Sequence, residues 1–120
     1  MKNNKSDYIT HSGANSEKVR KQALAYLKAE LGLDDEQVQG FLKTLSVPLK
    51  TTLEAVNKAC EAKNLTAIVE TAHSLKGALL NLGLNELADL ASRIEATAAT
   101  GENMAHESDL FYLHDALQLI

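Results

Sequence analysis

One histidine of the sequence is followed by residues that could take part in chemistry with it. Lys76 comes three positions after His73, and Gly77 comes four positions after it, so a helix would bring all three side by side. An exposed imidazole titrates close to neutral pH and keeps a large neutral, nucleophilic fraction at pH 7. Lysine one turn away can neutralise an anion attached to that imidazole. The spacing therefore indicates a nucleophile with a cation beside it.

The apolar residues around this histidine predict a helix over 65–82 that turns His73 outward. With about 100° per residue, the apolar positions fall between about 180° and 260° from His73, and they are Ile68, Ala72, Leu75, Leu79 and Leu82. Gly77 falls at about 40°, on the exposed side, although glycine within a helix costs roughly 1 kcal/mol relative to alanine. Its position indicates that something approaches the backbone closely there.

Three further residues share this exposed side and could form a docking surface. Val69 falls at about 320°, Leu80 at about 340° and Glu70 at about 60° from His73. Glu70 is expected to accept a hydrogen bond from the second ring nitrogen of His73 and thereby to orient the imidazole. Glu70 and His73 also have the Glu-x-x-His spacing of di-iron bundles, but such a site needs a second motif of this kind and more inward carboxylates. We therefore expect no metal site.

The composition favours a single all-helical domain. The 120 residues include 20 Leu and 17 Ala but one Pro and 4% aromatic residues, whereas β-proteins need more β-branched and aromatic residues. A chain of this length has room for one core. Residues 1–15 lack an apolar period and are expected to form a flexible tail before a folded domain over 16–120.

Local signals divide that domain into helices. Ser16 is expected to cap a first helix that ends at Gly32, and Asp34 with Gln37 resembles a capping box that opens the second. The second apolar stripe runs through Pro48, which either kinks one long helix or begins a new one. The continuity of the stripe favours one helix.

The later helices are expected over 65–82, over 84–100 and from about Asn103 to the end. The tight turn at Gly83 predicts that the first two of these form an antiparallel hairpin. The expected fold is all-α, an antiparallel up-down-up-down four-helix bundle with an additional N-terminal helix.

Charge and cysteine content exclude several classes of protein. The net charge of −4 argues against a nucleic-acid binder, and the single cysteine, Cys60, excludes an internal disulfide and a Cys-rich zinc site. No signal peptide or membrane-spanning stretch is visible, so we expect a cytoplasmic protein that does not bind membranes. Of the other histidines, His11 and His106 are expected to be exposed and His114 partly buried.

A longer pattern around His73 resembles a known family. The run His73-Ser74-Leu75-Lys76-Gly77, then Asn81-Leu82-Gly83 and Ile94-Glu95, looks like the signature of histidine-containing phosphotransfer (HPt) domains, which are four-helix bundles that relay phosphoryl groups. The resemblance covers roughly residues 31–117. The sequence departs from the pattern at Leu79 and Leu80, where many members carry smaller residues, and at Ile94, where leucine is usual.

The resemblance implies a phosphorelay carrier without kinase machinery of its own. His73 would accept a phosphoryl group from a receiver-domain aspartate and pass it to another receiver. Lys76 would contact the phosphoryl group and the acidic pocket of the receiver, Gly77 would leave space for docking, and Glu95 is expected to be structural or solvated. The implied partners are response-regulator receiver domains and a sensor or hybrid histidine kinase. The chain is expected to be a monomer. It is also expected to need no cofactor of its own, since the receiver would supply Mg²⁺.

Two other functions fit the same residues. The chain could be the phospho-accepting module of a chemotaxis-type kinase. It could also be a helical adaptor that is not phosphorylated and uses the His73 face only for binding. Replacement of His73 by glutamine separates the carrier, which would lose function, from the adaptor, which would keep it.

Overall fold

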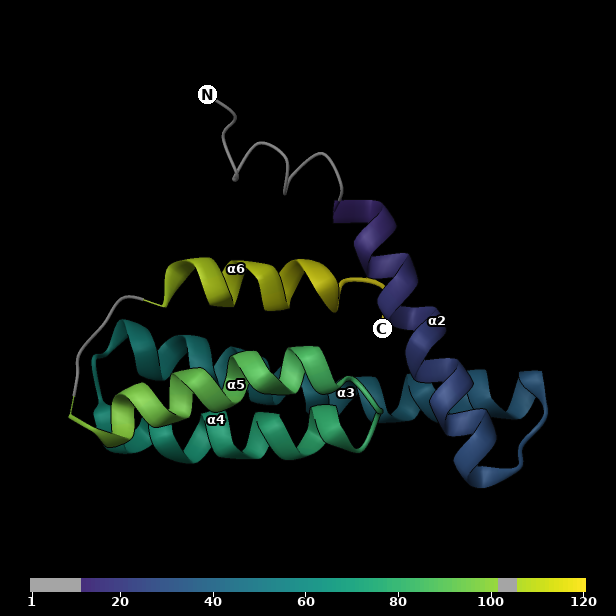
Figure 1. Ribbon diagram of the computed structural model, residues 1–120, viewed down its shortest axis with the longest axis horizontal. Coiled ribbons are helices and arrows are strands. Elements are labelled where there is room, and N and C mark those ends of the chain that lie inside the picture. Colours follow the sequence, from purple (N-terminus) through teal and green to yellow (C-terminus); the bar gives the residue numbers. More distant parts are fainter. Residues whose placement is uncertain (1–11, 102–105) are drawn as a thin grey trace.

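The computed structural model (Figure 1) describes residues 12–101 and 106–120, and all regular structure in these two ranges is helical. The helices are α2 (Ser12–Leu31), α3 (Asp35–Glu61), α4 (Leu65–Leu80), α5 (Asn85–Ala99) and α6 (Glu107–Ala116). Helices α3 to α6 extend along the long direction of the molecule, and α2 runs obliquely across the first part of α3 (Figure 1). The predicted all-helical class is confirmed.

The core is made of aliphatic side chains from all five helices. Burial of such side chains provides the main driving force for folding. On α4 the buried residues are those that the periodicity assigned to the inner side, and they are Ile68, Ala72, Leu75 and Leu79, with Leu82 just after the helix. This helical phase turns His73 away from the core.

Helix α3 begins and continues as predicted. The side chain of Asp34 accepts a hydrogen bond from the backbone N–H of Gln37 at 2.8 Å, and the Gln37 side chain accepts one from the backbone N–H of Asp34 at 3.1 Å. Both halves of the capping box are thus present. The helix runs through Pro48 as a single element of 27 residues, because its buried stripe continues on both sides of the proline.

Ser16 has a different role from the predicted one. Helix α2 begins at Ser12, so Ser16 lies inside the helix and is fully buried instead of capping it. Its hydroxyl accepts a hydrogen bond at 2.9 Å from the backbone N–H of Leu119, which follows the last helix. Of the predicted tail, residues 12–15 are helical, and residues 1–11 lie outside the described part of the chain.

The last helix is shorter than predicted. It spans Glu107–Ala116, and the expected start near Asn103 lies outside the described residues. His106 precedes the helix and is buried, whereas His114 is exposed on it, so both expectations for these histidines were wrong. The buried side of α6 consists of Leu110, Leu113 and Ala116. At about 100° per residue, His106 falls among these positions and His114 falls just outside them. His11 lies outside the described residues.

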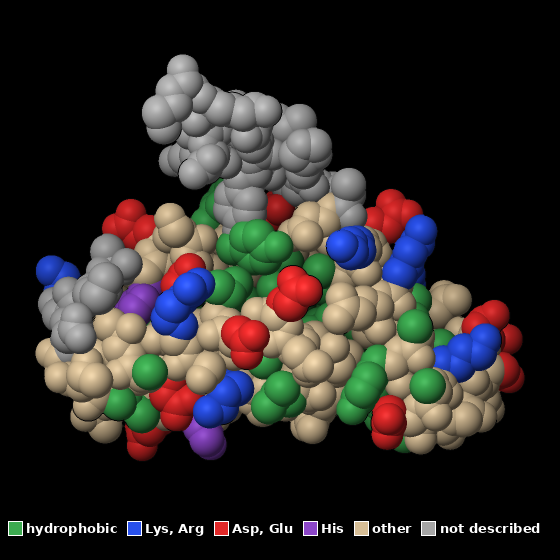
Figure 2. All heavy atoms as spheres, in the orientation of Figure 1, with side chains coloured by type: hydrophobic (Ala, Val, Ile, Leu, Met, Phe, Trp, Pro, Cys, Tyr) green, Lys and Arg blue, Asp and Glu red, His purple; other side chains and the backbone are tan. Residues whose placement is uncertain are grey.

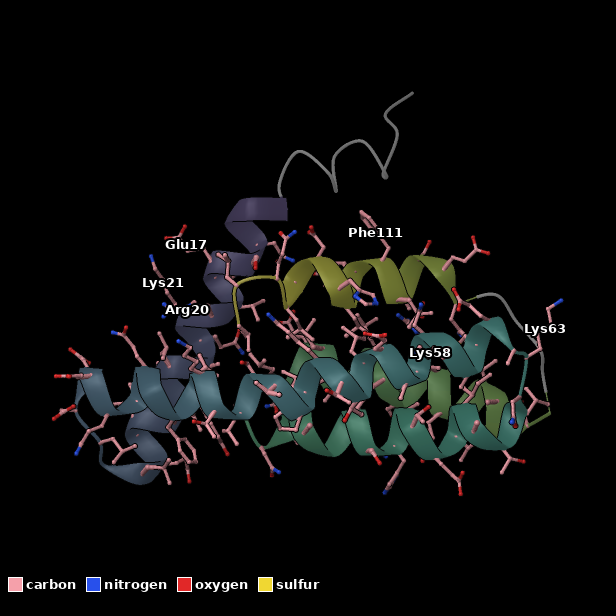
Figure 3. All side chains as sticks on the ribbon, turned by 180° about the vertical axis from the view of Figure 1, so that it is seen from behind. Glu17, Arg20, Lys21, Lys58, Lys63 and Phe111 are labelled. Atoms are coloured by element: carbon pink, nitrogen blue, oxygen red, sulfur yellow. The ribbon has the colours of Figure 1, made fainter. Side chains whose placement is uncertain are left out.

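The two connections that flank α4 end the preceding helix with the same hydrogen-bond pattern. After α3, the backbone N–H of Asn64 bonds to the carbonyl of Ala59, and Lys63 occupies the left-handed position with φ of 55°. Figure 3 shows the Lys63 side chain pointing away from the molecule where α3 meets α4. The Asn64 side chain then caps α4 by accepting from the N–H of Ala67 at 3.1 Å.

The turn between α4 and α5 is a Schellman motif centred on Gly83. The N–H of Leu84 donates to the carbonyl of Leu79 at 3.0 Å, and that of Gly83 donates to the carbonyl of Leu80 at 3.0 Å. Leu79 and Leu84 are both buried. Gly83 has φ of +70°, and a Cβ added to it would overlap the side chain of Tyr26 on α2. Both its backbone conformation and its neighbour therefore require glycine.

Replacement of Gly83 by alanine should destabilise the fold more than the same replacement at Gly32. Gly32 has φ of +65°, but a Cβ there would meet no atom within 4 Å. Gly32→Ala should thus cost only the left-handed strain of roughly 1–2 kcal/mol, whereas Gly83→Ala adds the overlap with Tyr26. Urea unfolding of both variants measures the difference. Equal losses would contradict the close packing of α2 on this turn.

Candidate functional site

His73, Lys76 and Glu95 form a connected cluster on the surface of α4 and α5. His73 and Lys76 lie one turn apart on α4, and Glu95 lies on the neighbouring helix α5. The Nδ1 atom of His73 is 2.9 Å from Oε2 of Glu95. The ammonium of Lys76 is 2.9 Å from Oε1 of the same carboxylate, as an ion pair rather than an aligned hydrogen bond. One carboxylate thus bridges both residues.

Burial differs strongly among the three side chains. The imidazole of His73 is 67% exposed, whereas the side chains of Lys76 and Glu95 are 28% and 20% exposed. The two charged groups are therefore held against the protein while the ring extends into solvent. This arrangement leaves the imidazole accessible to a large partner, while the contact with the less exposed Glu95 side chain orients the ring.

The neighbouring groups keep Glu95 ionised. The Lys76 ammonium, followed by the hydrogen bond from His73, lowers the pKa of Glu95, and partial burial opposes this shift only in part. An ionised carboxylate can only accept hydrogen bonds. Nδ1 of His73 must therefore be the donor, which assigns the ring proton of the neutral imidazole to Nδ1.

This assignment leaves Nε2 of His73 as the free nitrogen. In a neutral imidazole with its proton on Nδ1, the lone pair is on Nε2. A nucleophilic histidine needs an accessible lone pair and a group that fixes its tautomer. His73 has the tautomer-fixing group in Glu95 and the accessibility in its exposed ring.

The predicted docking residues are only partly brought together on this face. Leu80 is 46% exposed, as expected, and Glu70 is also exposed. Val69, expected on the exposed side, is instead partly buried and packs against the core. A Cβ on Gly77 would meet no atom within 4 Å, so no packing contact within the described chain requires glycine there.

The residue that contacts the imidazole was not the predicted one. The hydrogen bond to His73 comes from Glu95, and no hydrogen bond or ion pair joins Glu70 to His73. Glu70 lies on the same helix as His73, and the helical wheel of α4 alone could not reveal a partner on α5. The turn provides the missing signal: His73 comes ten residues before Gly83, and Glu95 comes twelve after it. Residues at similar distances from a tight turn lie level in an antiparallel hairpin.

Other kinds of site are not visible in the described residues. Within residues 12–101 and 106–120, no group of three or more His, Cys, Asp or Glu side chains is placed to hold a metal ion. None of the described helices combines the length and apolar character that a bilayer crossing requires. Figure 2 shows acidic and basic side chains interspersed on the face it draws, without one large basic patch.

The Glu95 carboxylate should make stability depend on pH below its ordinary pKa of 4.5. The pKa of Glu95 is lower in the folded state than in the unfolded state. Its contribution to the stability of the fold is therefore complete above the ordinary pKa and is lost as the pH falls through the folded-state pKa. The free energy of unfolding of the wild type should therefore decline relative to that of Glu95→Gln between about pH 5 and pH 3. Urea unfolding across this range measures the difference.

The matched control is Glu70→Gln, which removes the same charge from the exposed side of α4. Because no hydrogen bond or ion pair joins Glu70 to another described residue, this variant removes a carboxylate without removing a contact, and it should not reproduce the pH-dependent change of Glu95→Gln. A constant difference between Glu95→Gln and the wild type would show that the bridge to Lys76 and His73 does not stabilise the fold.

Comparison with known proteins assigns a family to this sequence. The family model described as Hpt domain matches residues 36–120, which include α4, α5 and all three residues of the cluster. Comparisons with curated proteins and with solved structures find no match. Hpt domains act in histidine phosphotransfer within phosphorelays. Because the match spans more than half of the sequence, the chain belongs to the Hpt domain family.

Proposed function

We propose that this chain is a phosphorelay carrier that accepts a phosphoryl group on Nε2 of His73 from a receiver-domain aspartate and passes it to a second receiver. One observation carries the proposal: Nδ1 of the exposed His73 ring lies 2.9 Å from Oε2 of Glu95. That contact fixes the tautomer with a free Nε2 and leaves this nitrogen facing solvent. A phospho-accepting histidine needs both properties.

The proposed transfer is a simple displacement at phosphorus. The Nε2 lone pair forms the N–P bond, the P–O bond to the receiver aspartate breaks, and its electron pair leaves on the aspartate carboxylate. The ring keeps its Nδ1 proton and becomes positively charged, and Glu95 accepts a hydrogen bond from that proton throughout. Phosphoryl transfer depends mainly on positioning and charge stabilisation, which a fixed ring beside an anionic carboxylate provides.

Lys76 is proposed to offset the negative charge of the incoming phosphoryl oxygens. Its ammonium lies against Glu95, one turn from His73, so the site holds a positive group close to where the phosphoryl oxygens arrive. Electrostatic stabilisation by a group already in place costs little reorganisation. The proposal assigns Mg²⁺ to the partner receiver and no cofactor to this chain.

The docking surface is proposed around Gly77 and Leu80, with Glu70 at its edge and Val69 as its partly buried margin. Leu80 offers an exposed apolar side chain, and the open space above Gly77 lets a partner approach the α4 backbone. The proposed partners are receiver domains and a sensor or hybrid histidine kinase.

The reversal of chain direction at each connection from α3 to α6 in Figure 1 supports the finer proposal of an up-down-up-down four-helix bundle with α2 added. A monomeric state and a cytoplasmic location stay predictions.

Phosphoryl transfer from a phosphorylated receiver domain tests the function directly. The wild type should gain an acid-labile, base-stable label, and His73→Gln should gain none. His114→Gln is the matched control, because His114 is also an exposed histidine on a helix and should be labelled like the wild type. Label that persists in His73→Gln would overturn the assignment of the site.

The adaptor alternative has a distinct outcome in the same experiment. A receiver that binds the His73 face of the wild type, but leaves no label on it or on His114→Gln, would identify a binding module. Undiminished binding by His73→Gln would then show that the imidazole takes no part in recognition. Label that is acquired from a chemotaxis-type kinase, and not from any receiver, would identify the chain as the phospho-accepting module of such a kinase.

Gly77→Ala should separate docking from folding. Alanine is favoured over glycine within a helix by roughly 1 kcal/mol, and space is open at Gly77, so the variant should be at least as stable as the wild type in urea. Its methyl group should nevertheless slow phosphoryl transfer from the receiver several-fold. Gly40→Ala on α3, where a Cβ also meets nothing, should gain similar stability and transfer at the wild-type rate. Equal transfer rates in the two variants would remove Gly77 from the docking surface.

A further inference from the structure

Two residues of α2 contact the same residue of the α4–α5 turn, Gly83. The side-chain Nε2 of Gln22 donates a hydrogen bond to the carbonyl oxygen of Gly83 at 3.2 Å. Tyr26 packs so closely on Gly83 that an added Cβ would overlap its Cβ and ring. Gln22 and Tyr26 are four residues apart and so lie on one side of α2. Together they form a clamp on the turn.

Helix α2 is itself fixed to the rest of the molecule on both sides of this clamp. Toward its beginning, Ser16 accepts the hydrogen bond from Leu119. Toward its end, Lys28 forms an ion pair with Asp35 at 2.7 Å. Between these points α2 buries Val19, Ala23 and Leu27 in the core. The clamp therefore holds the turn against a helix that is anchored independently of α4 and α5.

The clamp matters because the site spans the two helices that this turn joins. His73 is ten residues from Gly83, or about 15 Å along an α-helix, and Glu95 is at a similar distance on the other helix. A pivot of about two degrees at the turn moves an atom at this distance by about half an ångström. The 2.9 Å contact between Nδ1 and Oε2 would then leave the usual range of hydrogen bonds.

We propose that Gln22 and Tyr26 are positioning residues for His73, acting through Gly83 on the register of the α4–α5 hairpin. The inference builds on the proposed phosphotransfer at His73. It assigns a role in the site to α2, which lies before the matched family region of residues 36–120. Loss of the clamp leaves the nucleophile in place but loosens the bond that fixes its tautomer.

The test compares Tyr26→Ala and the milder Gln22→Ala with Val19→Ala. Val19 is buried on the same helix two turns before Tyr26, so its truncation weakens the packing of α2 but leaves both clamp residues unchanged. Tyr26→Phe keeps the ring and should behave like the wild type. Two measurements are made at a temperature where each protein is folded: the ¹⁵N shifts of the His73 ring, which report its tautomer, and the rate of phosphoryl transfer.

We expect Tyr26→Ala to raise the fraction of the Nε2–H tautomer and to slow transfer about threefold to tenfold, with a smaller effect in Gln22→Ala. Val19→Ala should lose comparable stability and change neither measurement. The proposal is overturned if Val19→Ala shifts the tautomer as much as Tyr26→Ala at equal loss of stability, or if both clamp variants keep the wild-type tautomer. The tautomer readout needs no phosphoryl donor, so it decides the positioning role even if His73 accepts no phosphoryl group.

Discussion

The site depends on the packing of α4 against α5, because its three side chains come from these two helices. The inner sides of both helices are aliphatic and buried, so the hydrophobic effect sets the rotation of each helix about its axis. That rotation brings His73 and Lys76 to the edge of α4 that faces Glu95. The polar contacts are then a consequence of apolar burial on the opposite side of the same helices.

The carboxylate of Glu95 connects the two properties that a phosphoryl acceptor needs. It fixes the proton of the imidazole on one nitrogen and it holds the lysine cation beside the ring. A neutral residue at this position could orient the ring but would leave the lysine without its counter-charge. Lys76 in turn lowers the pKa of Glu95, so the carboxylate stays an acceptor. The two interactions therefore support each other.

The sequence predicted those features that depend on neighbouring residues. The outward phase of His73, the capping box at Asp34 and the continuity of α3 through Pro48 all follow from patterns within one helix. The role of Glu95 depends on how two helices align across a turn, and the role of Ser16 depends on a contact with Leu119. Neither could be predicted from periodicity. The burial of His106 was missed because it depends on where α6 begins, and helix ends are the least certain part of such a prediction.

The hydrogen bond between Ser16 and Leu119 joins residues that are 103 positions apart. Closing so long a loop costs conformational entropy, which burial of apolar side chains in the core must repay. During synthesis on a ribosome, α2 emerges before the other described helices, yet the acceptor on Ser16 gains its partner only after α6 has been made. The first of the described helices is therefore among the last to reach its final hydrogen bonding.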